Sequence, residues 1–362
     1  MRASELIDTL EGIAPTRFAE SWDNVGLLVG DAAQDVSRVM LTIDYTDDVA
    51  AEAQAEKCDF VIAYHPPIFQ PLKRVVGGSL IFDAIRRGVG IYSPHTALDV
   101  AEGGTNDMLA DVLGLSEQSP LRLSEAKATQ VKLVTFVPEK DVERVSRALF
   151  DAGAGRIGDY SQCSFRSPGT GTFFGEAGTN PTVGQAGKLE QAPEIRLETI
   201  TPIARLTDVL TALRASHPYE EPAFDLVQLV APEGIGQGRV GALAPAAARP
   251  DLFARIKKGL EIEHLLIAGP TEGLVARAAC CAGACGEFLD DAIRQKAELY
   301  LTGEIRHHDA IKAARAGMTV VCTLHSNSER AVLKRLKQRL ESRHPALPVL
   351  LSRSDRDPFR VG

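Results

Sequence analysis

The sequence is poor in cysteine and tryptophan and has no long apolar run. Six cysteines and one tryptophan occur among 362 residues, and a chain of this length does not need disulfides to build a core. No apolar stretch approaches the roughly 18–20 residues of a membrane-spanning helix. The first residues, MRASELIDTLEG, form an amphipathic, acidic start without an apolar signal core. We therefore expect a cytoplasmic protein with no membrane partner.

An excess of basic residues is also absent. The 40 Lys+Arg residues face 48 Asp+Glu residues, which gives a formal net charge of −8. This balance argues against a dedicated nucleic-acid surface, which needs clustered positive charge. The chain lacks a G-x-S-x-G or C-x-x-C motif, so nothing supports covalent nucleophilic catalysis. With 44% hydrophobic and 24% charged residues, the composition is that of a soluble globular protein of two or three domains.

Strand-like and helix-like segments alternate in the first third of the chain and again after residue 233. In the first third, the pattern predicts strands at 36–45, 60–66 and 89–95 and helices at 51–59, 80–88 and 103–115. This alternation predicts βαβ units and an α/β fold with mainly parallel sheets. In such sheets, ligands bind at the carboxyl ends of the strands.

The middle of the chain has a different pattern. A β-α-β…β-α-β order between residues 128 and 230 is typical of a ferredoxin-like α+β domain of roughly 100 residues. We therefore predict a domain inserted into another domain. The first half of the core is expected at 1–127, the insert at 128–232 and the second half of the core at 233–362.

Histidine is scarce, and its positions are informative. Five of the eight histidines follow predicted strands or begin the next helix, beside three acidic residues: His65, His95, His307, His308 and His325, with Asp99, Glu304 and Glu329. In HSNSE, which is predicted to open a helix, His325 and Glu329 are four residues apart and should lie on one face. His95 and Asp99 have the same spacing. Imidazoles mixed with carboxylates suit zinc, manganese, iron or nickel and not calcium.

Two glycine-containing segments have alternative interpretations. Trp22–Gly30 includes the single tryptophan and reads as a structural loop that turns the first helix toward the sheet. Alternatively, Asp23 and Asn24 form part of the wall of a cleft. Gly283–Gly286 follows a predicted strand and precedes a helix. We predict a tight turn there, with a phosphate subsite as the alternative because backbone amides at such a position can bind an anion.

Five motifs in order carry a resemblance to a known family: SWDNVGLLVG, YHPPIF, HTALD with GGTND, TGEIRHHDA and HSNSER. Together they resemble the Nif-three-like proteins, also called the GTP cyclohydrolase I type 2 family or dinuclear-metal-centre hexameric proteins. Between them, GAGRIGDYSQCSF, GTGTFF and SHPYEEPAFD resemble the PII- and CutA-like domain that interrupts long-form bacterial members. The resemblance implies a two-half α/β core interrupted by a PII/CutA-like insert.

The resemblance also implies a dinuclear metal centre. The family's metal ligands match His65, Asp99, His325 and Glu329 in this sequence, and one carboxylate would be shared between two divalent ions. His95 and His308 match recurrent histidines of the family and are expected beside the ions in catalytic roles. The resemblance further implies a homohexamer.

One position departs from the family's pattern. Where relatives have tandem histidines, this chain has Tyr64 followed by His65. We hypothesise that His307, at a position where many members have another residue, supplies the missing metal-binding nitrogen. The alternative is a weaker second metal site in which the Tyr64 phenol is an outer hydrogen-bond donor.

These expectations favour a metal-dependent hydrolase. Two ions would lower the pKa of a bridging water toward neutrality, and His95 or His308 would carry a proton to the leaving group. The family name implies ring-opening hydrolysis of GTP, and another nucleotide or phosphate compound would use the same residues. The competing interpretations are a non-catalytic regulatory or scaffold protein whose insert senses a small ligand, and a protein of metal storage or delivery.

Overall fold

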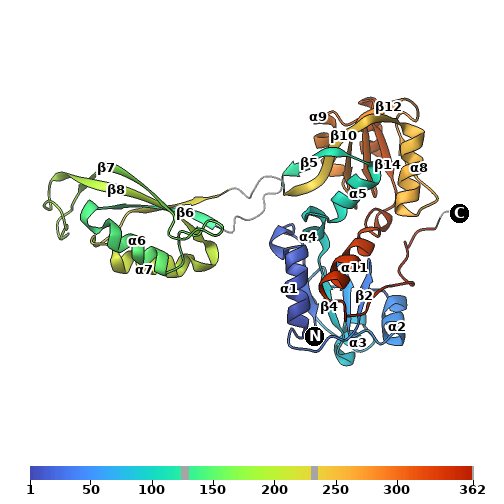
Figure 1. Ribbon diagram of the computed structural model, residues 1–362, viewed down its shortest axis with the longest axis horizontal. Helices are drawn as coiled ribbons and strands as arrows, with labels where there is room; N and C mark the ends of the chain where they lie inside the picture. Colours follow the sequence, from blue (N-terminus) through green and yellow to red (C-terminus); the bar gives the residue numbers. More distant parts are fainter. Residues whose placement is uncertain (124–129, 230–234, 361–362) are drawn as a thin grey trace. The chain divides into compact units, whose positions relative to one another are not determined.

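The computed structural model describes residues 1–123, 130–229 and 235–360 and divides into two compact units. The core unit comprises Met1–Ala126 and Pro232–Gly362, and the insert unit comprises Lys127–Ala231 (Figure 1). The predicted domain boundaries at 127/128 and 232/233 lie outside the described residues. The fold is a mixed α/β fold with three sheets, as the alternating pattern predicts.

The first sheet of the core unit is mainly parallel. Its strand order is β1 (Gly26–Val29), β4 (Gly90–Ser93), β3 (Phe60–Ala63), β2 (Val39–Thr42) and β15 (Val349–Leu351). Every pair except β1 and β4 is parallel. All residues of β2, β3 and β4 are buried. This burial explains why these strands appear in the sequence as short apolar runs without alternation.

Five helices accompany this sheet within the described residues: α1 (Ala3–Ile13), α2 (Asp47–Ala55), α3 (Leu80–Arg87), α4 (His95–Val100) and α11 (Val332–Arg343). The predicted helix at 51–59 in fact begins four residues earlier. The Thr46 side chain accepts a hydrogen bond from the Val49 N–H and caps α2 there. Helix α3 ends as predicted at Gly88, whose φ of 69° is the left-handed conformation that terminates helices.

The second sheet of the core unit mixes parallel and antiparallel pairs. Its strand order is β11 (Leu266–Ala268), β14 (Thr319–Cys322), β13 (Leu299–Thr302), β12 (Leu274–Cys281), β10 (Gly236–Ala248) and β5 (Ser116–Leu123). Only the pairs β12·β13 and β13·β14 are parallel among its five described pairings. The expectation of mainly parallel sheets is therefore wrong for this sheet. Strands β5 and β10 are antiparallel neighbours and need no helical crossover of the βαβ kind. Its helices are α5 (Thr105–Leu113), α8 (Arg249–Leu260), α9 (Leu289–Arg294) and α10 (His307–Arg315).

The last two elements return to the first sheet. Strand β15 pairs in parallel with β2, and α11 lies beside β2 (Figure 1). Leu336 and Leu340 of α11 join Leu6 and Leu10 of α1 in one buried apolar cluster. The predicted second half of the core therefore completes the core of the first half, which the sequence pattern does not indicate.

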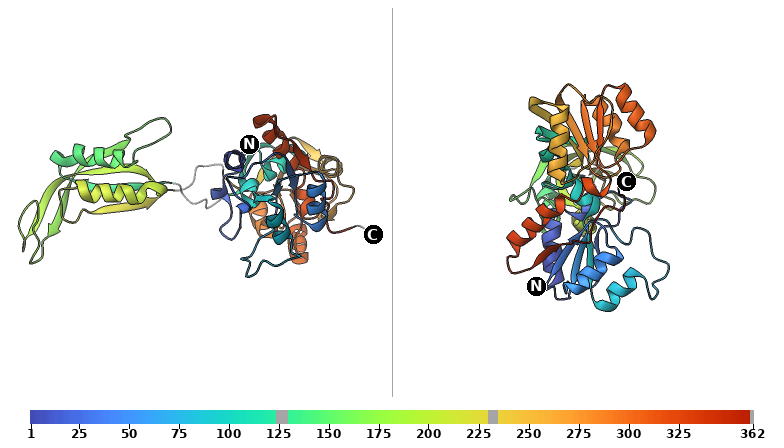
Figure 2. Two further views of the ribbon diagram at one scale, coloured as in Figure 1. Left: turned by 90° about the horizontal axis from the view of Figure 1, so that it is seen from below. Right: turned by 90° about the vertical axis from the view of Figure 1, so that its right-hand side faces the viewer.

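The insert unit has the predicted β-α-β-β-α-β order. It consists of β6 (Gln130–Val137), α6 (Val142–Asp151), β7 (Ser164–Phe174), β8 (Leu189–Pro202), α7 (Leu206–Ser216) and β9 (Phe224–Gln228). The sheet order is β7-β8-β6-β9, and all three pairings are antiparallel. Helices α6 and α7 cover one face of this sheet (Figures 1 and 2). Strand β7 lies in a glycine-rich stretch whose mostly exposed residues give no apolar signal.

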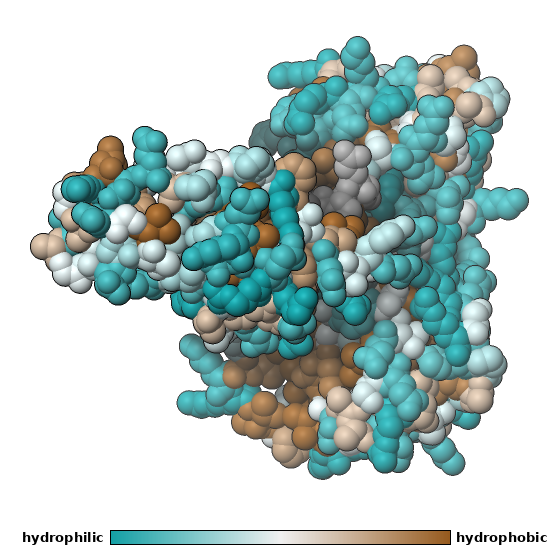
Figure 3. All heavy atoms as spheres, turned by 60° about the vertical axis from the view of Figure 1, so that its left-hand side comes forward, coloured by the Kyte–Doolittle hydropathy of each residue, from teal (hydrophilic) through white to brown (hydrophobic). Residues whose placement is uncertain are grey.

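The surface of the molecule is largely polar. On the face drawn in Figure 3, hydrophilic side chains predominate and hydrophobic ones form smaller patches. Three aromatic residues in the described part of the core unit are exposed: Trp22 at 58%, Phe69 at 45% and Phe359 at 69%. None of the helices in the described residues has the length and apolarity needed to cross a membrane.

Candidate metal centre

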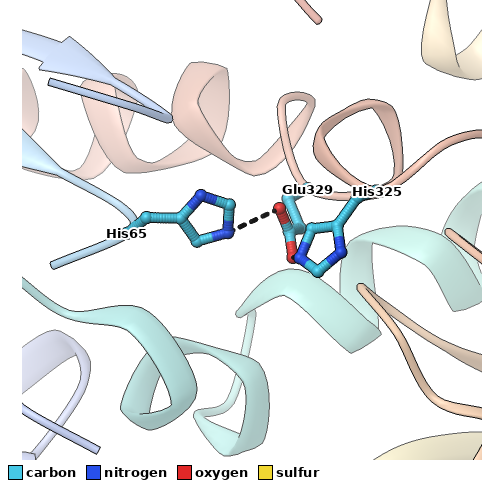
Figure 4. A group of neighbouring side chains, drawn as sticks. All are labelled: His65, His325 and Glu329. Carbon is cyan, nitrogen blue, oxygen red and sulfur yellow. Dashed lines mark ion pairs between the residues drawn. The ribbon is translucent and has the colours of Figure 1, made fainter. Parts of the chain in front are cut away.

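Two histidines and one glutamate from distant parts of the chain meet inside the core unit. His65 follows β3 of the first sheet, and His325 and Glu329 follow β14 of the second sheet. One ligand atom of each lies within 4.8 Å of the others, and the three side chains point toward one another (Figure 4). The placement of His65 agrees with the rule that ligands bind at the carboxyl ends of parallel strands.

The Glu329 carboxylate lies between the two imidazoles. Its Oε2 is 3.1 Å from Nε2 of His65, and its Oε1 is 3.3 Å from Nε2 of His325. Glu329 is only 3% exposed, and its Oε2 faces Nε2 of His65 as an ion pair that lacks hydrogen-bond geometry. Two imidazoles and a carboxylate in this arrangement fit a divalent transition metal.

Each of three histidines is oriented by a carboxylate. Nδ1 of His65 lies 2.9 Å from Asp44, Nδ1 of His95 lies 2.7 Å from Asp23, and Nδ1 of His325 lies 2.9 Å from Glu304. These contacts leave the three Nε2 atoms available to a ligand. Metal-binding histidines typically have such a carboxylate partner on the other ring nitrogen. The repeated arrangement therefore adds independent support for a metal centre.

Asp44 was not assigned to the site from the sequence, and Asp23 was assigned to it only as an alternative. Asp44 follows β2 by two residues, so its position at the carboxyl end of a strand was the available signal. Asp23 belongs to the segment interpreted as a structural loop. That interpretation is wrong in part, because Gly26–Val29 is strand β1, paired with β4. The alternative, a contribution to the wall of the site, describes Asp23 better.

Asp23 fixes the start of α4. Its side chain is fully buried and accepts hydrogen bonds from the Thr96 N–H and hydroxyl as well as contacting His95. Burial alone would raise the pKa of Asp23, but these contacts hold it below its usual value. The backbone of His95 has a φ of 25°, a conformation that a non-glycine residue adopts only when its surroundings enforce it.

Asp99 is joined to the residue that departs from the family's pattern. Tyr64 is fully buried and donates its phenol hydrogen to Oδ1 of Asp99, and its Oη lies 3.2 Å from the Thr105 hydroxyl. Burial raises the pKa of Asp99 to about 6. The tyrosine thus has the position of a hydrogen-bond donor behind a predicted ligand, which corresponds to the alternative drawn from the sequence.

His307 and His308 lie apart from the cluster of His65, His325 and Glu329. Both are exposed at the start of α10, with ring centroids 5.5 Å apart. Within the described residues, the structure does not bring His307 into a group of three potential ligands. The His95 ring, in contrast, lies 5.4 Å from the His65 ring.

The charge distribution favours protonated imidazoles in the metal-free protein. Burial opposes protonation of His65, but the Asp44 and Glu329 carboxylates raise its pKa to about 10. Glu329 is the main reason that the pKa of His325 is raised to about 9. A metal ion must displace these protons, so its apparent affinity should fall as the pH is lowered.

The sequence suggested that the segment from His325 to Glu329 opens an α-helix, and the structure shows that this is wrong. The segment forms a 3₁₀ turn at Ser326–Ser328, and α11 begins only at Val332. The Ser328 hydroxyl donates to the His325 carbonyl and accepts the Gly283 N–H. Such side-chain bonds to the backbone compete with helix formation. The turn nevertheless places His325 and Glu329 together.

Gly283 lines the centre from the second sheet. A Cβ atom at this position would lie 3.0 Å from Oε1 of Glu329 and 3.5 Å from Nε2 of His325. The predicted tight turn is present, and its φ of 77° favours glycine. The Gly283 N–H is already bonded to Ser328, so this amide does not support the alternative of a phosphate subsite.

Replacing Asp44 by asparagine tests the orienting contacts. We expect Asp44→Asn to weaken metal binding about 10- to 100-fold, the usual effect of losing an outer partner of a ligand histidine. The exposed Asp47 in the first turn of α2 provides the control, and Asp47→Asn should bind metal like the wild type. Competition with a chelator of known affinity measures the metal affinity of both variants. Equal affinities in the two variants would contradict the assignment.

Comparison with known proteins finds one family whose profile matches almost the whole chain. The profile of the Duf34/NIF3 (NGG1p interacting factor 3) family matches residues 1–358. The chain is 36% identical to a "GTP cyclohydrolase 1 type 2 homolog" of Halalkalibacterium halodurans over 93% of this chain and 91% of that protein. It is 33% identical to the protein of the same description from Bacillus subtilis, over 99% and 98%.

Solved structures give the same result for the fold. A Bacillus cereus protein related to NIF3 has a TM-score of 0.69 at 32% identity, covering 100% of this chain and 99% of that one. Staphylococcus aureus protein SA1388 has a TM-score of 0.81 at 26% identity with the same coverage. The likeness thus extends over both units.

Proposed function

Because the chain belongs to the Duf34/NIF3 family, we propose that it is a metal-dependent hydrolase of GTP or of a related nucleotide or phosphate compound. The observation that carries the proposal is the buried Glu329 carboxylate between Nε2 of His65 and Nε2 of His325, at 3.1 and 3.3 Å, with both imidazoles oriented by carboxylates. Relatives described as GTP cyclohydrolase 1 type 2 homologs support the substrate class.

His65, His325 and Glu329 would hold one divalent ion, and Asp99 would bind a second, with the Glu329 carboxylate shared. A bound ion of this kind lowers the pKa of its water toward neutrality. Zinc, manganese, iron and nickel all suit this donor set. Tyr64 would hold the Asp99 carboxylate in place through the phenol hydrogen bond.

His95 is the better placed of the two histidines proposed for proton transfer. With its Nδ1–H donated to Asp23, the neutral ring has an unprotonated Nε2 that can accept a proton. Asp23 then stabilises the imidazolium, much as a buried carboxylate does in other acid–base sites. His308, exposed on α10, remains the second candidate. His307 would not be needed as a ligand when Tyr64 supports Asp99.

We also propose that the insert unit is a PII/CutA-like domain at about 128–232 and that the protein is a cytoplasmic homohexamer. The antiparallel β7-β8-β6-β9 sheet with both helices on one face supports the first part. Analytical ultracentrifugation of the full chain tests the second part, since a monomer or dimer would contradict it.

The hydrolase proposal is tested by measuring turnover with protein that has been loaded with a single known metal. The chain would be stripped of metal, reloaded with zinc, manganese, iron or nickel, and assayed with GTP and with tripolyphosphate. Asp99→Asn should reduce turnover about 100-fold or more, while Asp47→Asn should leave it unchanged. If the protein retains metal but hydrolyses neither compound under any metal, the proposal fails and a regulatory or scaffold function takes its place.

A further inference from the structure

Trp22 and Phe69 form an exposed aromatic pair beside the metal centre. Their ring centroids are 6.0 Å apart with an angle of 56° between the planes. Both side chains are largely exposed, at 58% and 45%. Exposed large aromatic side chains that lie together indicate a binding surface more often than isolated ones do. Because both rings are exposed to solvent, they do not form a packed pair of the core.

The backbone next to each ring is tied to the other segment and to the metal centre. The residue after Trp22 is Asp23, which holds His95. The Asn24 side-chain amide donates to the carbonyl of Ile68, the residue before Phe69. These contacts connect the segments that carry the two rings to each other and to His95. The aromatic pair therefore belongs to a hydrogen-bonded part of the structure next to the metal centre.

A continuous row of rings leads from this pair to the proposed ligands. The Trp22 ring lies 6.1 Å from the His95 ring, His95 lies 5.4 Å from His65, and His65 lies 5.3 Å from His325. An aromatic group stacked on Trp22 is therefore separated from His65 by the ring of His95. What reaches the metal centre is the part of the molecule that extends beyond the stacked ring.

The charges of the same loop complement an anion. Lys73 and Arg74 follow Phe69 closely, are exposed, and form no ion pair in the part of the chain that the structure describes. Positive charge near a binding surface raises the local concentration of an anionic ligand. The loop therefore offers an apolar aromatic surface and unpaired cations together, the combination that a nucleotide requires.

We propose that Trp22 and Phe69 bind the planar base of a nucleotide whose phosphate chain extends to the metal centre. This inference rests on the proposed function and narrows it to hydrolysis at phosphate. The rings select for a flat heteroaromatic group and not for one particular base, since every base has a face that stacks. Loss of one stacking ring typically weakens binding about 10- to 100-fold.

Trp22 is the single tryptophan of the chain, so its fluorescence reports directly on the site. In the metal-loaded full chain, GTP should quench this fluorescence saturably, and tripolyphosphate, which has no base, should not. Phe69→Leu should raise the Kd and the KM for GTP about 10-fold and leave the KM for tripolyphosphate unchanged. The control is Phe359→Leu, because Phe359 is also exposed, at 69%, and should affect neither value.

Two results would overturn the proposal. The first is equal affinity for GTP and tripolyphosphate in the wild type, with no effect of Phe69→Leu. The second is a tryptophan that acrylamide cannot quench in the purified protein, which would mean that a second copy of the chain covers the pair. Either result leaves the hydrolase proposal intact if tripolyphosphate is still hydrolysed. Quenching by GTP without any turnover would instead support the aromatic site and contradict the hydrolase.

Discussion

Glu329→Gln is expected to abolish metal retention. Both Glu329 oxygens face an imidazole nitrogen, at 3.1 and 3.3 Å, and an amide presents a neutral nitrogen in place of one of them. The loss should exceed the 10- to 100-fold effect of removing an outer partner. Elemental analysis after dialysis against a graded series of chelator concentrations measures the metal equivalents per chain. We expect two equivalents in the wild type and none in the variant at moderate chelator concentrations.

The control for this experiment lies in α11. Glu341 is partly exposed and pairs with Lys337 one turn earlier, so Glu341→Gln should retain metal like the wild type. A Glu329→Gln protein that is folded and keeps its metal would refute the centre described above. One equivalent in the wild type would mean that the exchange of histidine for Tyr64 removes the second site.

Gly283→Ala is expected to damage the centre without changing any ligand. The added methyl group would lie 3.0 Å from Oε1 of Glu329, a distance at which the carboxylate must shift by a few tenths of an ångström. We expect metal affinity to fall about tenfold or more. The positive φ of 77° adds a destabilisation of about 1–2 kcal/mol, which thermal unfolding of the metal-free protein measures.

Gly317→Ala separates these two effects. Gly317 has nearly the same φ, 74°, but no atom lies within 4 Å of the position of an added Cβ. Both variants should therefore lose similar stability, while only Gly283→Ala loses metal. Equal loss of metal in the two variants would show that backbone strain, and not contact with Glu329, controls the centre.

The sequence predicts part of this centre because its ligands carry local signals. His65 and His325 follow short apolar strands, and Glu329 is four residues after His325. The orienting carboxylates are different, since Asp44 and Asp23 lie 21 and 72 residues from the histidines that they contact. Only the tertiary fold brings such pairs together. The phenol bond from Tyr64 to Asp99 is likewise a product of the fold, although the sequence shows that position 64 is unusual.

The fold was predicted best where strands are buried on both faces. β2, β3 and β4 appear as apolar runs, and their parallel pairing follows from the helices between them. The antiparallel pairs of the second sheet were missed because the sequence pattern did not identify β5, β10 and β11 as strands. β15 was missed because three residues near the end of the chain carry too little pattern to be distinguished from a loop.

The pairing of β15 with β2 has a consequence for the synthesis of this protein. Val39 leaves the ribosome 310 residues before its partner Val349. Until then the edge of β2 has no neighbour, and an open strand edge invites association with other chains. The insert unit, whose strands pair with one another within residues 130–228, has no such delay. A nascent chain thus carries a continuous middle segment whose strands can pair early, while the first sheet requires β15 and the metal centre requires Glu329.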